Sequence, residues 1–260
     1  MSERPLVTQF TALARRSITR TLRQPAQIVP SMIFPLFLLA VNAGGLNEAT
    51  KLPGFPTSSY LTFALAVPFI QGGLFSVMNA GTDLAGDVET GFLNRLALTP
   101  LRGAVLLAGM LAGVVVLGLV QAIAFVIVGL AAGAGFAAGV GGVAVIFALS
   151  LIMSLGFGAV GAFIALRTGS AEAVQGMFPL FFVFLFLSSG SLPHDLIEQE
   201  WFRFIATYNP VSYLIEGIRS LLITGWDAEA LLLGFGIAAA ILVAALAAAS
   251  AALRTRLVRT

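Results

Sequence analysis

The stretch from Ala104 to Ala132 decides the fold: it reads AVLLAGMLAGVVVLGLVQAIAFVIVGLAA and contains no Asp, Glu, Lys, Arg or His. A helix needs about 20 such residues to cross the roughly 30 Å of hydrocarbon in a bilayer. Five further runs are long and apolar enough to do the same: Ile28–Leu46, Tyr60–Ala80, Val143–Leu166, Val174–Leu192 and Ala230–Ala252. The sequence therefore predicts an all-α membrane protein with six transmembrane helices.

Composition points to the same class. Of 260 residues, 58% are hydrophobic and 10% are charged, and the mean hydropathy is +0.99, whereas a soluble domain carries about 25% charged residues. The chain has no cysteine, which excludes disulfides, thiolate metal sites and a cysteine nucleophile. The net charge of +2 is small and the basic residues gather at helix ends, so we expect membrane lipid, and no nucleic acid, as a partner.

The distribution of basic residues predicts the orientation, because cytoplasmic loops of membrane proteins retain Lys and Arg. If both termini are cytoplasmic, three of the 14 basic residues fall outside, namely Lys51, Arg203 and Arg219. The other eleven fall inside: Arg4, Arg15, Arg16, Arg20, Arg23, Arg95, Arg102, Arg167, Arg254, Arg256 and Arg259. The abundance of Arg, Ala and Gly suggests a bacterial source. We expect a multi-pass protein of the bacterial inner membrane with both termini in the cytoplasm.

The N-terminal segment predicts a helix of its own. One half of this helix is apolar and the other is basic: the first contains Leu6, Val7, Phe10, Leu13, Ala14 and Ile18, the second Arg15, Arg16, Arg20 and Arg23. A helix with this division lies in the membrane plane with its arginines among lipid phosphates, and Pro25 ends it. The alternative is a basic flank that only sets topology. We expect residues 1–25 to form an interfacial amphipathic helix and residues 26–260 a six-helix transmembrane domain.

Few polar side chains are left in or near the predicted spans; they are Gln71, Asn79, Gln121 and Gln175. We expect each to form interhelical hydrogen bonds rather than to bind a ligand, and Gly109 and Gly113, four residues apart, to let two helices approach. The single histidine, His194, stands beside Asp195 without the further partners that catalysis or a metal ion needs. We expect neither a catalytic nor a metal site.

Two segments between the spans carry motifs. Residues 87–101 read DVETGFLNRLALTPL on the cytoplasmic side, and residues 209–219 read NPVSYLIEGIR on the outer side. Together they resemble the permease subunit of type-2 ABC exporters, the group that includes the daunorubicin-resistance and nodulation-factor permeases. That family typically has acidic-x-Glu-x-Gly-x-Leu-x-Arg-Leu and then Thr-Pro, and later Asn-Pro-x-Thr/Ser-aromatic-x-x-Glu-x-x-Arg. Phe92 and Asn94 depart from the pattern, because the family usually has Thr and Glu there.

The cytoplasmic motif has the properties of a coupling helix. Acidic residues from Asp83 onward precede Arg95 and make a short bipolar helix, for which Gly91 permits an elbow and Pro100 a stop. Leu93, Leu96 and Ala97 offer a small apolar face. The resemblance implies that this elbow inserts into a cleft of an ATPase through Asp87, Glu89, Gly91, Leu93, Arg95, Leu96, Thr99 and Pro100. The alternative is an ordinary solvated loop.

The outer motif is too apolar for a loop and too broken for a span. Pro193 and Pro210 bound a first amphipathic piece, and a second helix follows in which Glu216 and Arg219, three residues apart, can pair. We expect two short re-entrant or surface helices between spans five and six. The motif residues are Asn209, Pro210, Glu216 and Arg219, and the last two are expected to help plug the exit.

ATP must be handled by another chain. A P-loop requires a lysine after its glycines, and the only lysine, Lys51, lies in a predicted outer loop. We therefore expect no enzyme activity and no cofactor on this chain, with ATP and Mg on a cytoplasmic ABC ATPase. The resemblance implies two permease copies, identical or different, that export an amphipathic drug, lipid or natural product. Export of a polysaccharide or lipid-linked glycan, and a non-transporting scaffold, are the alternatives.

Phenylalanines in spans one, two and five are candidates for an apolar pathway. They are Phe34, Phe37, Phe69, Phe178, Phe181, Phe182, Phe184 and Phe186. The alternative is that these rings face lipid or pack between helices.

The unequal distribution of charge predicts the result of a topology experiment. Reporter domains fused after Arg102 and after Arg259 should be active in the cytoplasm, because most basic residues share their side of the membrane. Reporters inserted near Lys51 and near His194 should be active outside. A cytoplasmic signal from the Lys51 site would show that the spans are assigned wrongly.

Overall fold

The structure is a computed structural model that describes residues 6–97 and 102–258; the part described consists of helices and their connections and has no strand. The helices are α1 Leu6–Leu22, α2 Pro25–Gly45, η1 Asn47–Lys51, α3 Tyr60–Ala64, α4 Ala66–Glu89, α5 Phe92–Ala97, α6 Gly103–Ala131, α7 Gly139–Thr168, α8 Ala171–Phe186, η2 His194–Leu196, α9 Glu200–Tyr208, α10 Pro210–Ile223 and α11 Ala228–Val258.

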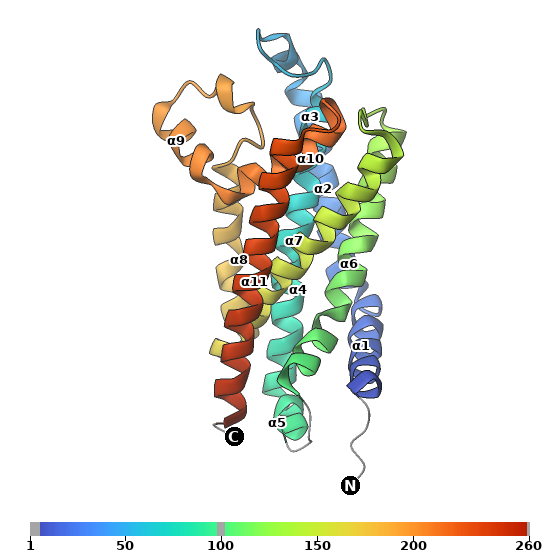
Figure 1. Cartoon of the computed structure of the whole chain (residues 1–260), viewed down its shortest axis with the longest axis vertical. Helices are drawn as coiled ribbons and strands as arrows, with labels where there is room; N and C mark the ends of the chain where they lie inside the picture. Colours follow the sequence, from blue (N-terminus) through green and yellow to red (C-terminus); the bar gives the residue numbers. More distant parts are fainter. Residues whose placement is uncertain (1–5, 98–101, 259–260) are drawn as a thin grey trace.

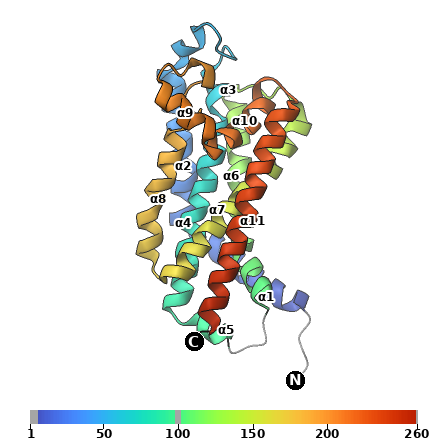
Figure 2. The same cartoon turned by 60° about the vertical axis from the view of Figure 1, so that its left-hand side comes forward.

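The long helices run along one axis, and the short ones gather at its two ends. Figure 1 shows α1, α5 and the C-terminal end of α11 at one end, with α3, α9 and α10 at the other. Figure 2 shows the same division after rotation. The segments predicted to be cytoplasmic thus share one end of the bundle.

The helix α4 is the centre of the bundle. It packs against α2, α6, α7 and α8. In the most apolar window of Tyr60–Glu89, 83% of the residues are buried inside the chain, against 17% for both α2 and α11. The outer helices therefore keep most of their apolar surface for lipid or for other chains, while α4 is enclosed by protein.

Small residues allow the close packing around α4. A Cβ atom on Gly161 of α7 would overlap the backbone carbonyl of Val77 on α4. Likewise, a Cβ on Gly73 would lie 3.0 Å from the Phe157 ring. Lipid tails are as apolar as side chains, so association of helices in a membrane depends on such close contact.

Five helices are long and apolar enough to cross a membrane: Pro25–Gly45, Tyr60–Glu89, Gly103–Ala131, Gly139–Thr168 and Ala228–Arg256. These correspond to the predicted first, second, third, fourth and sixth spans. The predicted fifth span, Val174–Leu192, extends six residues too far, because α8 ends at Phe186. Its 16 residues cover about 24 Å. The multi-pass membrane class is confirmed, and a sixth complete span stays a prediction.

The second span differs from its prediction at both ends. Leu65 interrupts it near the start, between α3 and α4, and α4 then continues to Glu89, well beyond the predicted end at Ala80. Asp83 and Asp87 therefore belong to the last turns of α4 and not to a loop. The prediction stopped too early because it counted only apolar residues.

The hydrogen bond that Pro35 removes from α2 is replaced by a side chain of another helix. Pro35 has no N–H for the carbonyl group of Ser31, four residues earlier. The side-chain amide of Gln121 on α6 donates to that carbonyl at 3.5 Å and to the Ser31 hydroxyl at 2.9 Å. The expectation that Gln121 joins two helices is confirmed.

The contact of Gly161 with α4 predicts an effect on stability. Gly161→Ala should lower the free energy of unfolding by about 1–3 kcal/mol, because the new methyl group forces two backbones apart. The matched control is Gly236→Ala on α11, where a Cβ would meet nothing within 4 Å. Thermal melting of the detergent-solubilised protein should separate the two variants. Equal melting temperatures would contradict the close packing of α4 and α7.

Candidate functional site

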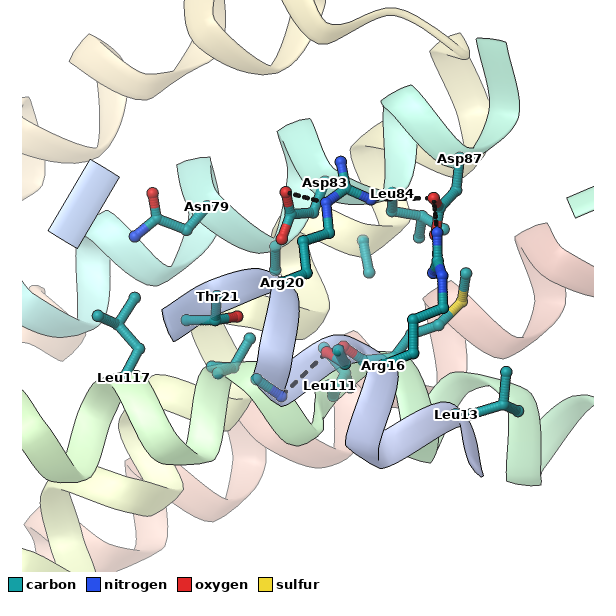
Figure 3. A pocket seen from close by; sticks show the side chains of 16 residues that line it. Leu13, Arg16, Arg20, Thr21, Asn79, Asp83, Leu84, Asp87, Leu111 and Leu117 are labelled. Atoms are coloured by element: carbon teal, nitrogen blue, oxygen red, sulfur yellow. Dashed lines mark hydrogen bonds and ion pairs between the residues drawn. The ribbon is translucent and has the colours of Figure 1, made fainter. Parts of the chain in front are cut away.

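Two arginines of α1 bind two carboxylates at the C-terminal end of α4. The Arg16 guanidinium forms a bidentate pair with Asp87, Nη1 to Oδ2 at 2.8 Å and Nη2 to Oδ1 at 2.6 Å. Arg20 bridges both acids, with Nη1 at 2.9 Å from Asp87 Oδ1 and Nε at 3.0 Å from Asp83 Oδ1. Figure 3 shows these side chains pointing at one another across the gap between α1 and α4. We call this group the α1–α4 ionic cluster.

Burial makes the ionic cluster a strong contact. The Asp87 side chain is 7% exposed, and charged partners in good geometry compensate for the desolvation of a buried carboxylate. The hydrogen bond to Asp87 raises the pKa of Arg16, so this residue stays charged. The expectation that Arg16 and Arg20 lie among lipid phosphates is therefore wrong for both residues.

A sequence signal for the ionic cluster existed. Arg16 and Arg20 are four residues apart, as are Asp83 and Asp87, so each pair lies on one face of its helix. Two such faces of opposite charge are complementary. The prediction missed the match because it ended the second span before the acids.

The helix α1 is also seated on α6 by close contacts. The hydroxyl of Ser17 donates to the Met110 carbonyl at 2.7 Å and accepts from the Gly113 N–H at 3.0 Å. A Cβ on Gly109 would lie 2.6 Å from the Leu13 Cβ. The two glycines thus let α1 and α6 approach, as predicted. Leu6, Val7 and Phe10 remain exposed as an apolar surface of α1, whose in-plane orientation stays a prediction.

The elbow between α4 and α5 is formed by Gly91. Its φ of +69° lies in the left-handed region, and a Cβ there would meet nothing within 4 Å. Beyond it, Arg16 lies 3.9 Å above the Phe92 ring, a cation–π contact that links α1 to α5. Asn94 and Arg95 are exposed. Gly91 therefore sets the direction in which α5 presents this polar surface.

The remaining predicted coupling residues divide into three groups. Leu93 is fully buried and Leu96 packs against the core, so Leu93 is not available to a partner, contrary to the expected apolar face. Glu89 is exposed, and its carboxylate accepts from the Ala171 N–H at the start of α8 at 3.3 Å. Thr99 and Pro100 lie outside the described residues.

At the other end, Asn209 joins α8 to α10. Its amide donates to the carbonyls of Phe184 and Leu187 at 2.6 and 3.0 Å, and its Oδ1 accepts from the Val211 N–H at 2.9 Å. One side chain thus caps the end of α8 and the start of α10. Pro210 occupies the first turn of α10. A backbone N–H at this position would have no acceptor within the helix, so the proline removes no helical hydrogen bond. This double cap explains why α8 ends before Leu192.

Arg219 is the buried hub of the outer end. Its side chain is 4% exposed, and Nη1 lies 2.6 Å from Glu216 Oε1. Its other nitrogens donate to the carbonyls of Phe63 at 3.2 Å and Gly190 at 3.1 Å, and its Cζ lies 3.6 Å from the Phe63 ring centroid. The Glu216 side chain is 42% exposed and also accepts from the Ser189 hydroxyl at 2.8 Å. Arg219 therefore fastens α10 to α3 and to the turn after α8.

The phenylalanines predicted to line a pathway do not form one group. Phe34, Phe178 and Phe182 meet with Phe75, which the sequence analysis missed; neighbouring ring centroids in this aromatic cluster are 5.2–6.2 Å apart. Phe69 instead pairs with Phe125 of α6 at 5.5 Å. Phe181 is partly buried, and Phe37, Phe184 and Phe186 are exposed. The cluster joins α2, α4 and α8.

The burial of Arg219 predicts an unequal response to mutation. Arg219→Ala should cost about 3–5 kcal/mol of stability, since it empties the space of a buried side chain and leaves the carbonyls of Phe63 and Gly190 without their donor. Arg219→Lys should recover little, because an ammonium lacks the planar fork, whereas Glu216→Gln should be milder, since the amide oxygen still accepts.

The control is Arg203→Ala, which removes an exposed arginine from the same end and should cost no more than about 1 kcal/mol. The measurement is thermal melting in detergent. If Arg219→Ala and Arg203→Ala have the same melting temperature, the Arg219 guanidinium is solvated and does not hold these segments together.

Comparison with known proteins agrees with this architecture. Residues 8–223 match the family described as ABC-2 type transporter. The chain is 29% identical over 219 residues to the transport permease ycf38 of Porphyra purpurea, covering 82% of this chain and 74% of that protein. It is also 29% identical over 222 residues to ycf38 of Pyropia yezoensis and 25% identical over 218 residues to ycf38 of Cyanophora paradoxa, each match covering 83% of this chain and 74% of the relative. The match spans α1, the ionic cluster, the elbow and the Arg219 hub, and the chain belongs to the ABC-2 type transporter membrane family.

Proposed function

We propose that this chain is the membrane-spanning permease of an ATP-driven exporter. Two permease copies, identical or different, would work with two cytoplasmic ATPase subunits that bind ATP and Mg. The observation that carries the proposal is α5, a short helix with exposed Asn94 and Arg95 that extends from the most deeply buried long helix. The family supports an ATPase partner, and the relatives are named as transport permeases.

Movement of α5 would pass directly into the bundle. Leu93 is fully buried, so α5 is anchored to the bundle, and the left-handed conformation of Gly91 sets its angle to α4. The helix α4 packs on α2, α6, α7 and α8, and close-packed protein interiors transmit strain. Closure of an ATPase beneath α5 would therefore move α4 as a lever.

The ionic cluster makes α1 part of the same moving unit. Arg16 contacts both Asp87 on α4 and Phe92 on α5, while Ser17 holds α1 to α6. Breaking the Asp87 contacts would separate α4 from α1 and would thereby remove one of the connections between α4 and α6. We infer that the cluster serves to transmit motion as well as to hold the fold together.

An amphipathic drug, lipid or natural product is the cargo that the surface favours. The exposed faces of α2 and α8 carry large aromatic rings, such as Phe37 and Phe184, and the aromatic cluster lies between these helices and α4. A polysaccharide would instead require polar groups along its route. We also propose a bacterial inner membrane and cytoplasmic termini, which the basic residues and the placement of α1, α5 and the end of α11 at one end support.

The test is a transport assay on the complex with the ATPase that co-purifies with the chain, reconstituted into vesicles containing daunorubicin or a fluorescent phospholipid. Asp87→Asn keeps the shape of the side chain but removes the charge that both arginines bind, and Gly91→Val strains the elbow without a clash. Each should reduce ATP-dependent transport at least about tenfold while ATP hydrolysis and assembly persist. Glu89→Arg should act similarly, because it reverses the charge between α4 and α8.

The matched control is Arg15→Gln, which removes an exposed arginine from α1 and should leave transport unchanged. Wild-type transport in the Asp87, Glu89 and Gly91 variants would refute the coupling proposal. Absence of any co-purifying ATPase would refute the exporter itself and favour a scaffold.

A further inference from the structure

A cavity of about 160 Å³ lies between α2, α3–α4 and α8, at the outer end of the aromatic cluster. Its apolar walls include Leu39 and Leu185, and its polar lining includes Asn42 and Gln71. Phe186, which is 65% exposed, stands at its edge and stacks near Phe182 at 6.2 Å. The cavity is therefore continuous with an apolar surface on the outside of the bundle.

Gln71 supplies a neutral side-chain amide to the wall of the cavity. The residue is 2% exposed, and its Oε1 has no hydrogen-bond partner among the described residues. Buried side-chain oxygens nearly always have one, and the expected interhelical hydrogen bond is absent at this atom. Pro68, on the same wall, has no N–H for the carbonyl of Ala64, which also lines the cavity. The side-chain amides of Asn42 and Gln71 add N–H donors to the same wall.

The lining also lacks charge. Among the described residues that line the cavity, none is Asp, Glu, Lys, Arg or His. The Tyr60 hydroxyl, a potential donor, is already committed to the Ser191 carbonyl at 2.7 Å. A charged group would enter at a high desolvation cost without a counterion. The matching ligand group is neutral and both donates and accepts hydrogen bonds, as a hydroxyl group does.

The size of the cavity limits that group. A cavity of about 150 Å³ accommodates a benzene ring, and a water molecule occupies about 30 Å³ in the liquid. The space between α2 and α8 therefore suits one six-membered ring with its substituents. The rest of a larger molecule would extend past Phe186 along the exposed apolar face.

We propose that this cavity binds the uncharged, hydroxyl-bearing ring of an amphipathic molecule, with the Gln71 amide hydrogen-bonded to a ring hydroxyl. The apolar body lies against Phe186 and the adjoining faces of α2 and α8. The inference deepens the proposed function, on which it rests for taking the bound molecule as cargo. It assigns Gln71 to the selection of neutral over charged amphiphiles.

The experiment measures binding of radiolabelled octyl β-D-glucopyranoside to the chain in lipid nanodiscs, without ATP or ATPase. Empty nanodiscs give the background from partition into lipid. Saturable binding is expected, and Gln71→Leu should weaken it about tenfold, as loss of one hydrogen bond predicts. Octyltrimethylammonium, of equal chain length but charged, should not compete.

Two further variants make the result specific. Asn79→Leu removes another buried amide of α4, whose side-chain atoms also have no partner among the described residues but which does not line the cavity; it should bind the glucoside as wild type does. Val67→Phe fills the cavity while keeping Gln71 and should abolish binding. Unchanged affinity in Gln71→Leu, or equal competition by the charged amphiphile, would overturn the site.

Absence of saturable binding to the wild type would also overturn it and would leave water as the occupant. Because the assay uses no ATPase, such a failure leaves the coupling proposal standing. Failure of the transport assay, conversely, leaves the binding result intact.

Discussion

A chain surrounded by hydrocarbon has no solvent to satisfy its polar groups, so these groups must find partners within the protein. The structure meets this constraint with a few side chains that each serve several helices. Gln121 compensates for the missing N–H of Pro35, Asn209 caps two helices at once, and Arg219 collects carbonyls from two other segments. These contacts fix the relative positions of helices whose apolar surfaces alone would allow many arrangements.

The two ends of the bundle satisfy their polar groups in different ways. The end with α3 and α10 is held by one buried guanidinium that donates to two carbonyls, an arrangement that resists displacement. The end with α1 and α5 is held by charge pairs between separate helices, and the Arg16 and Arg20 side chains remain partly exposed. Water can therefore replace these contacts at lower cost than those of Arg219. The end beside the Gly91 elbow is thus the easier of the two to rearrange.

The sequence predicted correctly those features that depend on a single local property of the chain. Long apolar runs located five spans, Gly91 marked the elbow, and the spacing of Glu216 and Arg219 anticipated their pairing. It was less informative where partners are distant in the chain. The end of α8 depends on Asn209, more than twenty residues later, and the acids of α4 are matched by arginines about seventy residues earlier. Phe75 escaped notice for the same reason, because its importance comes from rings on two other helices.

The shortness of α8 has a consequence for the lipid around it. Its 16 residues fall about 6 Å short of a typical hydrocarbon core, while its neighbours are fully long. If α8 crosses the membrane as the predicted fifth span, the bilayer on this flank has to thin locally or draw the polar turn after Phe186 inward, and either response costs energy in proportion to the mismatch. Membrane thickness thereby becomes a variable that acts on one side of the protein, next to the aromatic cluster, and bilayers of shorter acyl chains relieve strain there first.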